Sequence, residues 1–249
     1  MDTVNKVWKF MKENRYAQVL LAIFFIIGAA LYFRLFFTTG IYMDNTFLKK
    51  EVEGGETYYI GKSVDGHFLV TVIGEKDKDS SAEVVYHLPN NIVREFTIVF
   101  KEPTNWDAGM DTLKDNDGKV HKIGFYDKES PFLVDDGGEP IFDEKGMVSM
   151  YFNGESIYNR HYTINLKWVA DLAYGNSDTY RGKPEFLVPA LLAIGLTLFD
   201  MKFPLFFFYT RNILDVRDPE PSDFYLLMQR ISWVVMPVIG GVLLIVAVV

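Results

Sequence analysis

The sequence contains no cysteine, and this absence excludes several kinds of chemistry. Without thiols the chain forms no disulfide, carries no thiolate nucleophile and offers no thiolate ligand to a metal. It also lacks the short motifs of common active sites, namely G-x-S-x-G, H-E-x-x-H, the P-loop and G-x-G-x-x-G. Its four histidines have no metal-like spacing. The sequence therefore predicts a protein that is not an enzyme, with no catalytic residue and no cofactor.

Charge is absent from long stretches near both ends of the chain. Tyr16–Phe33 and Ile231–Val249 are uncharged runs of 18 and 19 residues, and Phe186–Phe199 is a shorter one. A bilayer core of about 30 Å needs roughly 20 apolar residues in a helix. The sequence predicts three transmembrane helices, over residues 16–38, 184–209 and 223–249. No A-x-A cleavage site follows the first, which we expect to be an uncleaved anchor.

Positive charges set the expected orientation. Lys6, Lys9, Lys12 and Arg15 cluster in a tail over residues 1–15, which the positive-inside rule places in the cytoplasm. Residues 40–183 then lie outside, 210–222 form a cytoplasmic loop, and the C-terminus is outside. The outer region has more acidic than basic residues, which disfavours nucleic acid as a partner.

The region outside the membrane is expected to be a mainly antiparallel β domain with one helix. Segments rich in β-branched and aromatic residues alternate with turn residues between Gly55 and Glu102, as in a four-strand meander. Thr104–Asp117 is expected to be a loop, whereas 119–127 and 146–152 are expected to contain strands. Ile164–Gly175 has helical periodicity with a terminal glycine.

Two acidic stretches are weak candidates for a cation site. Asp115 and Asp117 stand in KDNDGK, which resembles part of a calcium loop, but Leu113 and Gly124 occupy two positions that must be acidic. The simpler interpretation is a turn between strands. A second patch surrounds two glycines and is more simply a solvated loop; its members are Asp135, Asp136, Glu139, Asp143 and Glu144.

Charged residues at the membrane are candidates for function. Arg34 is expected to anchor its helix at the outer headgroups. Asp200 is either buried and paired with Arg230 or Lys202, or it ends its span at the headgroups. In the second case the aromatic run Phe203–Tyr209 lies along the inner surface.

The stretch RDPEPSDFYLLMQRI, residues 217–231, has the features of a helix start. Pro221 suits a first turn, and capping oxygens are available to free amides from three residues, Asp218, Glu220 and Ser222. Gly240 and Gly241, facing Gly195 or Gly28, would allow close helix packing.

The last 80 residues or so carry a resemblance. Its motifs are Ala170–Gly175, Tyr180–Gly182, Phe203–Tyr209 and Asp218–Ile231, the last containing E-P-S-x-x-Y-L-x-x-x-R-I. This pattern resembles an uncharacterised family of membrane proteins of low-GC Gram-positive bacteria. The resemblance implies a bacterial cell membrane and supports the three-span topology. It implies no activity.

Three functions remain as hypotheses. The first is a non-enzymatic protein of the lipid bilayer whose outer β domain binds a partner, envelope component or ligand. Its helices would anchor it or pack with a membrane protein partner or in a homo-oligomer. The second is an oligomeric channel or transporter component using Asp200 and Arg230. The third is an envelope hydrolase or transferase that uses the acidic loop.

Overall fold

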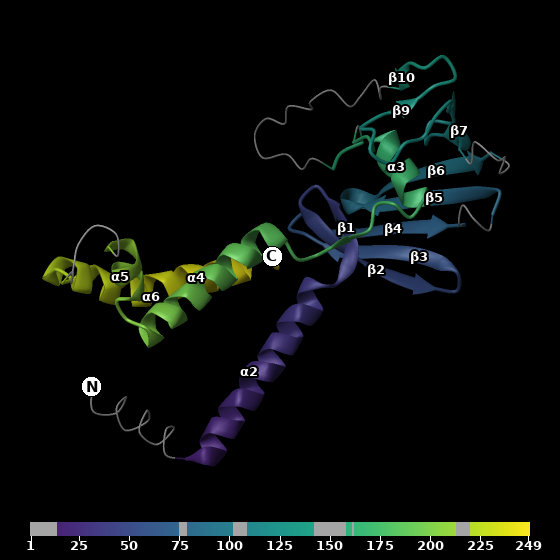
Figure 1. The fold of residues 1–249 in the computed structure, drawn as a ribbon. Helices are drawn as coiled ribbons and strands as arrows, with labels where there is room; N and C mark the ends of the chain where they lie inside the picture. Colours follow the sequence, from purple (N-terminus) through teal and green to yellow (C-terminus); the bar gives the residue numbers. More distant parts are fainter. Residues whose placement is uncertain (1–13, 75–78, 102–108, 142–157, 161, 213–219) are drawn as a thin grey trace. The chain divides into compact units, whose positions relative to one another are not determined.

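The computed structural model describes residues 14–74, 79–101, 109–141, 158–160, 162–212 and 220–249 (Figure 1). The chain divides into two compact units. The sheet unit is Thr39–Tyr180, and the helical unit combines residues 1–38 with Arg181–Val249. The three long apolar helices and the large antiparallel sheet expected from the sequence are both confirmed.

The sheet unit is built on nine antiparallel strands in the order β11-β1-β2-β3-β4-β5-β6-β7-β8. Apart from β11, neighbours in the sheet are neighbours in the sequence, so the meander is longer than expected. The bounds are β1 Thr39–Met43, β2 Thr46–Glu53, β3 Glu56–Lys62, β4 His67–Ile73, β5 Ser81–Leu88, β6 Ile92–Phe100, β7 Met110–Lys114, β8 Val120–Lys122 and β11 Thr179–Tyr180. A separate hairpin pairs β9 Leu133–Val134 with β10 Pro140–Ile141.

Two tight turns set the register of the first three strands. Asp44 and Asn45 join β1 to β2 with φ of 45° and 64°, and Gly54 and Gly55 join β2 to β3 with φ of 65° and 91°. Two-residue hairpins need positive φ at both positions, which Asn, Asp and Gly tolerate best. These turns explain why the pairs Tyr42–Phe47 and Val52–Thr57 face each other.

One face of the sheet carries the core. Alternate residues point to it, and β5 shows the strict alternation of buried and exposed positions that a half-covered strand requires. Helix α3, Leu166–Ala173, contacts β5 and β6 and buries Val169, Ala170 and Leu172. The Asn165 side chain caps it by accepting a bond from the Lys167 amide at 2.8 Å.

The sequence missed some of these strands. β1 and β2 lie before the expected start of the meander, and β7 lies within Thr104–Asp117, which was wrongly expected to be a loop. The sequence MDTLK of β7 does not alternate apolar and polar residues, so it was not recognised as a strand, although Met110 and Leu113 are buried. The strand expected at 119–127 is limited to β8, and the one expected at 146–152 lies outside the described residues.

Buried tyrosine hydroxyls of the sheet unit differ in whether they have a carboxylate partner. Tyr59 donates to Asp178 at 2.8 Å, and Tyr158 donates to Asp44 at 3.0 Å. Burial, reinforced by Asp178, raises the pKa of Tyr59, so its hydroxyl stays a donor. Tyr86 is 2% exposed, and its hydroxyl has no hydrogen-bond partner among the described residues. A buried hydroxyl without a partner carries an uncompensated desolvation cost.

We expect Tyr86→Phe and Tyr59→Phe to change stability in opposite directions. Tyr86→Phe removes the unpaired hydroxyl and should leave the free energy of unfolding unchanged or raise it by up to about 1 kcal/mol. Tyr59→Phe removes a paired hydroxyl from an equally buried ring and should cost about 1–3 kcal/mol. Denaturant unfolding of both variants measures the difference. A larger loss for Tyr86→Phe would mean that its hydroxyl has a partner.

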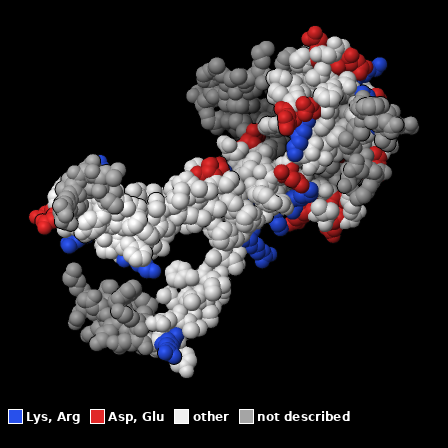
Figure 2. Space-filling view, viewed as in Figure 1, with Lys and Arg blue, Asp and Glu red and all other residues white. Residues whose placement is uncertain are grey.

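The helical unit contains the three candidate spans. They are α2 Arg15–Phe36, α4 Pro184–Lys202 and α6 Asp223–Val246, each long and apolar enough to cross a membrane. A short helix, α5 Phe206–Asn212, follows α4. Figure 2 shows few charged side chains on these helices between their ends, in contrast to the sheet unit. Most of their apolar side chains are exposed, as expected of surfaces that face lipid or other membrane helices.

Backbone hydrogen bonds join one end of each of the three helices. The Gly182 amide donates to the Phe36 carbonyl at 2.8 Å, and the Lys183 amide donates to the Ala247 carbonyl at 2.8 Å. Arg181 Nε donates to the Val248 carbonyl at 2.9 Å. Phe36, Ala247 and Val248 form a small buried cluster beside these bonds. The end of α2, the start of α4 and the end of α6 therefore lie together.

Helices α4 and α6 pack closely at one glycine. A Cβ on Gly240 would lie 2.6 Å from Ile194 Cγ1 and 3.2 Å from the Ala190 carbonyl oxygen. A Cβ on Gly241, Gly195 or Gly28 would meet no other atom within 4 Å. The prediction that these glycines face Gly240 across the helix contact is therefore wrong. A single small residue against Ala190 brings the two helices together, because larger side chains would hold the backbones apart.

Gly240→Val should separate α4 from α6, whereas Gly241→Val should not. The two substitutions have the same helix propensity cost, and only the first fills the contact with Ile194. We expect Gly240→Val to lower thermal stability in detergent by about 1–3 kcal/mol more than Gly241→Val. Equal effects would show that this contact does not hold the pair together.

Candidate functional site

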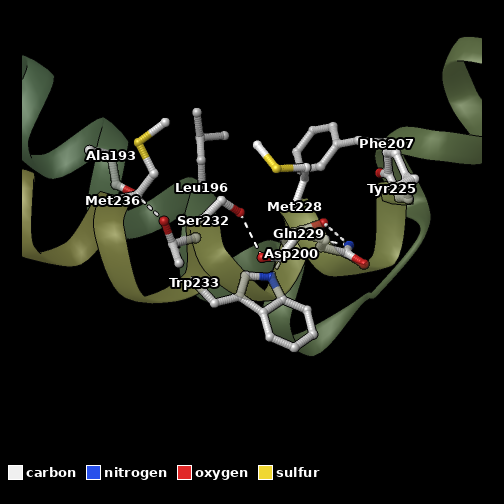
Figure 3. Close-up of a pocket in the computed structure, with 11 residues that line it drawn as sticks. Ala193, Leu196, Asp200, Phe207, Tyr225, Met228, Gln229, Ser232, Trp233 and Met236 are labelled. Atoms are coloured by element: carbon white, nitrogen blue, oxygen red, sulfur yellow. Dashed lines mark hydrogen bonds between the residues drawn. The ribbon is translucent and has the colours of Figure 1, made fainter. Parts of the chain in front are cut away.

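A polar cluster around Asp200 interrupts the apolar contact between α4 and α6. Gln229 Nε2 donates to Asp200 Oδ1 at 3.1 Å and to Oδ2 at 3.0 Å. Trp233 Nε1 donates to Asp200 Oδ2 at 2.7 Å. Figure 3 shows both side chains of α6 directed at the carboxylate from α4. Gln229 and Trp233 are four residues apart, so a helix presents them on one face.

The Asp200 cluster borders a cavity of about 430 Å³ between α4, α5 and α6. Aromatic and sulfur-containing side chains form much of its wall, with Phe207 from α5 and Tyr225, Met228 and Met236 from α6 (Figure 3). Gln229 is buried, and Asp200 is partly exposed to the cavity. An apolar cavity with a few convergent polar groups is the usual form of a small-molecule site.

The expected partners of Asp200 were wrong. Within the described part of the chain, Asp200 makes no ion pair with Arg230 or Lys202; both of these cations are exposed. The Lys202 ammonium instead lies 5.3 Å from the Phe203 ring. Sequence reasoning looked for opposite charge and missed the neutral donors Gln229 and Trp233. Gln229 and Trp233 are hydrogen-bond donors four residues apart near the start of an apolar helix. This spacing was the signal in the sequence that could have indicated them as partners of a buried acceptor.

The other charged and capping residues singled out in the sequence lie at helix ends. Arg34 lies in the last turn of α2 and is exposed, and the Thr38 hydroxyl donates to its carbonyl at 2.9 Å. Ser222 caps α6 by accepting a bond from the Tyr225 amide at 3.2 Å. Pro221 and Glu220 precede this cap, with Glu220 exposed, and Asp218 lies outside the described residues.

The two acidic stretches are matching hairpin loops. Asp115 Oδ1 accepts bonds from the amides of Asp117 and Lys119, at 3.0 and 2.9 Å. Asp135 Oδ1 accepts bonds from the amides two and four residues later, Gly137 and Glu139, at 2.8 and 2.9 Å. Each leading aspartate thus organises its own turn.

No group of three or more potential metal ligands occurs in the part of the chain that the structure describes. Asp117 and Asp136 stand within the turns, while Asp143 and Glu144 lie outside the described residues.

The face of the sheet opposite α3 carries exposed apolar side chains. Ile60, Leu69, His87 and Val93 face one another across four strands, beside a second row formed by Tyr58, Thr71, Val85 and Glu95. Ile60 is 44% and Val93 is 39% exposed. Exposed charged residues of both signs on these strands and on β2 border this apolar centre, namely Lys49, Glu51, Glu53, Lys62, Glu83 and Glu95. We call these residues the uncovered face.

Comparison with known proteins assigns a family to one segment of the chain. A family model described as a family of unknown function, DUF6199, matches residues 189–247. No curated protein and no solved structure matches the chain. The matched segment runs from α4 to the end of α6 and contains Asp200, its two hydrogen-bond donors and every residue that lines the cavity. The Ala170–Gly175 and Tyr180–Gly182 motifs lie outside the match.

The hydrogen bonds of the Asp115 carboxyl predict how the stability of the sheet unit depends on pH. Burial alone would raise the pKa of its carboxyl, but hydrogen bonds from His121 and the amides of Lys119 and Asp117 outweigh it and lower the pKa below 3.8. A lowered folded-state pKa stabilises the fold at pH values above the unfolded-state pKa, and this contribution is lost as pH falls through the folded-state value.

We expect Asp115→Asn to reduce the acid sensitivity of the sheet unit. The asparagine oxygen can still accept the turn amides but is not ionised, so stability should fall less steeply from about pH 5 to about pH 2 than in the wild type. Denaturant unfolding across this range measures the slope. An unchanged slope would show that Asp115 does not contribute to it.

Proposed function

We propose that this chain is a non-enzymatic, membrane-anchored binding protein whose outer sheet unit holds a protein partner on its uncovered face. The three helices anchor the chain in a bacterial cell membrane, with residues 1–15 and 210–222 in the cytoplasm. The sheet unit and the C-terminus then lie outside.

Contacts at the helix ends support this topology. The end of α2, the start of α4 and the end of α6 lie together, as three successive spans of alternating direction require. The sheet unit is inserted between Thr38 and Arg181, whose backbones are hydrogen-bonded at 2.9 Å, so it joins the helical unit at these same ends. The basic tail before α2 then marks the opposite end as cytoplasmic.

The uncovered face is the observation that carries the proposal. An antiparallel sheet with one face toward water normally places polar residues there. Here Ile60, Leu69, Val85 and Val93 occupy its centre, with charged residues around them. An apolar centre with a charged rim is the usual anatomy of a protein interface. Lys49 lies opposite Ile60 on this face and Lys62 follows it on β3, so the rim carries charges of both signs and favours a partner whose contact surface is apolar with a mixed charged border.

A second candidate is an oligomeric channel or transporter component. Asp200, Gln229, Ser232 and Thr197 place polar groups along the cavity between α4 and α6, which favours it. One helical hairpin per chain does not enclose a pore, so several copies or a partner would be needed. Arg230 is exposed and does not line the cavity, so it is not required in this version.

The experiment is a mild-detergent pull-down from the native membrane with substitutions on and off the uncovered face. Wild type should retain a partner in stoichiometric amount. Ile60→Lys and Val93→Lys place a charge in the apolar centre and should reduce the retained partner by about tenfold or more. Val64→Lys changes an exposed turn residue and should not. Retention by all variants, or no partner with wild type, would refute the proposal.

Placement of the sheet unit is checked in the same cells. Because the chain has no cysteine, Val64→Cys introduces a single thiol in the turn between β3 and β4. A membrane-impermeant maleimide should label it in intact cells. Labelling only after lysis would place the sheet unit inside and contradict this part of the proposal.

A further inference from the structure

The cavity beside Asp200 changes from apolar to polar along its length. Asp200 lies level with Gln229, to which it is hydrogen-bonded, whereas Ala193 and Met236 lie about two turns farther along their helices. Because α4 and α6 run in opposite directions, Ala193 and Met236 lie at the same end of the cavity, which is the end nearer the middle of the two helices. The cavity therefore has a charged end and an apolar end, as the binding site of an amphiphile does.

The charged end has a carboxylate without a cation. Three N–H contacts reach its two oxygens, from the neutral donors Gln229 and Trp233. A carboxylate has about four acceptor positions, so it can still accept a bond. No cationic group pairs with it among the described residues. A charge at the border of an apolar region needs a counter-charge, and a positively charged donor meets this need best.

The depth of Asp200 suggests where the cation comes from. Asp200 stands two residues before the end of α4, about 24 Å from its start at 1.5 Å per residue. This distance brings it near the headgroups on that side of a bilayer whose apolar core is about 30 Å thick. Lys202 and Arg230 are exposed and stand within two residues of Asp200 and Gln229 in sequence. Residues one or two apart on a helix do not share a face, and neither cation lines the cavity, so the cavity offers a headgroup only the Asp200 carboxylate, which would receive its ammonium.

We propose that the α4–α6 cavity binds a phospholipid with a primary-ammonium headgroup, with the ammonium on Asp200 and an acyl chain along Leu196 and Met236. Tyr225 and Trp233 add aromatic rings beside the ammonium, which suit a cation in an apolar setting. The whole site lies within residues 189–247, the segment matched by the family model. The proposal requires the helices to lie in a membrane, but it does not depend on a partner at the uncovered face.

The test titrates the full chain in detergent with three lipids and counts bound lipid by native mass spectrometry. Phosphatidylethanolamine has an ammonium with N–H donors, phosphatidylcholine has a cation without them, and phosphatidylglycerol has no cation. Wild type should prefer phosphatidylethanolamine over phosphatidylglycerol by about tenfold or more, with phosphatidylcholine between them.

Two variants and one control locate the site. Asp200→Asn should reduce phosphatidylethanolamine binding to the phosphatidylglycerol level. Leu196→Trp fills the apolar end and should reduce binding while keeping the carboxylate, and because Leu196 is exposed the larger side chain does not disturb a buried core. Glu185→Gln changes an exposed carboxylate in the first turn of α4 and should leave the lipid preference unchanged.

Three outcomes would overturn the proposal. They are an equal affinity for all three lipids, a preference that survives Asp200→Asn, and a lysine-bearing helix of another protein cross-linked at Leu196 in place of lipid. If wild type retains no protein partner but keeps its lipid preference, the proposed function alone is refuted. The two proposals therefore fail separately.

Discussion

The hydrogen bonds among Phe36, Gly182, Lys183 and Ala247 are the contacts on which the helical unit depends. Residues far apart in the sequence meet there, and the polypeptide leaves and re-enters the unit at the same place. Helix ends leave amides and carbonyls without partners in their own helix, and unpaired backbone groups are costly near a membrane. Here the chain that links the units supplies these partners, so one set of bonds both satisfies the helix ends and fixes where the sheet unit is inserted.

The α4–α6 pair combines close contact at one end with polarity at the other. Gly240 against Ala190 lets the backbones approach, while Asp200, Gln229 and Trp233 hold the opposite end by hydrogen bonds. Small residues and buried hydrogen bonds are the two means by which helices associate where lipid removes the hydrophobic driving force. The family match, residues 189–247, covers most of α4 and all of α5 and α6.

Composition and periodicity predicted the spans, the antiparallel sheet and α3, because each depends on the spacing of apolar residues along a single segment. They failed where the answer depends on contacts between segments. β1 and β2 precede the point where the meander was expected to begin, at Gly55, and MDTLK in β7 buries only Met110 and Leu113. For Asp200, opposite charge pointed to Arg230 or Lys202, but the packing of α4 on α6 selected an amide and an indole. Spacing along one helix does not determine which face meets its neighbour.

Both outermost strands of the large sheet are very short. β11 has two residues and β8 has three, so each exposes few free backbone groups to another strand. A protein confined to a membrane meets copies of itself in two dimensions and in a fixed orientation, which brings sheet edges into register far more often than free diffusion does. Long, flat edges would then join copy to copy into continuous ribbons. Short edges end such growth at its first step, so copies of the sheet can be crowded together without polymerising.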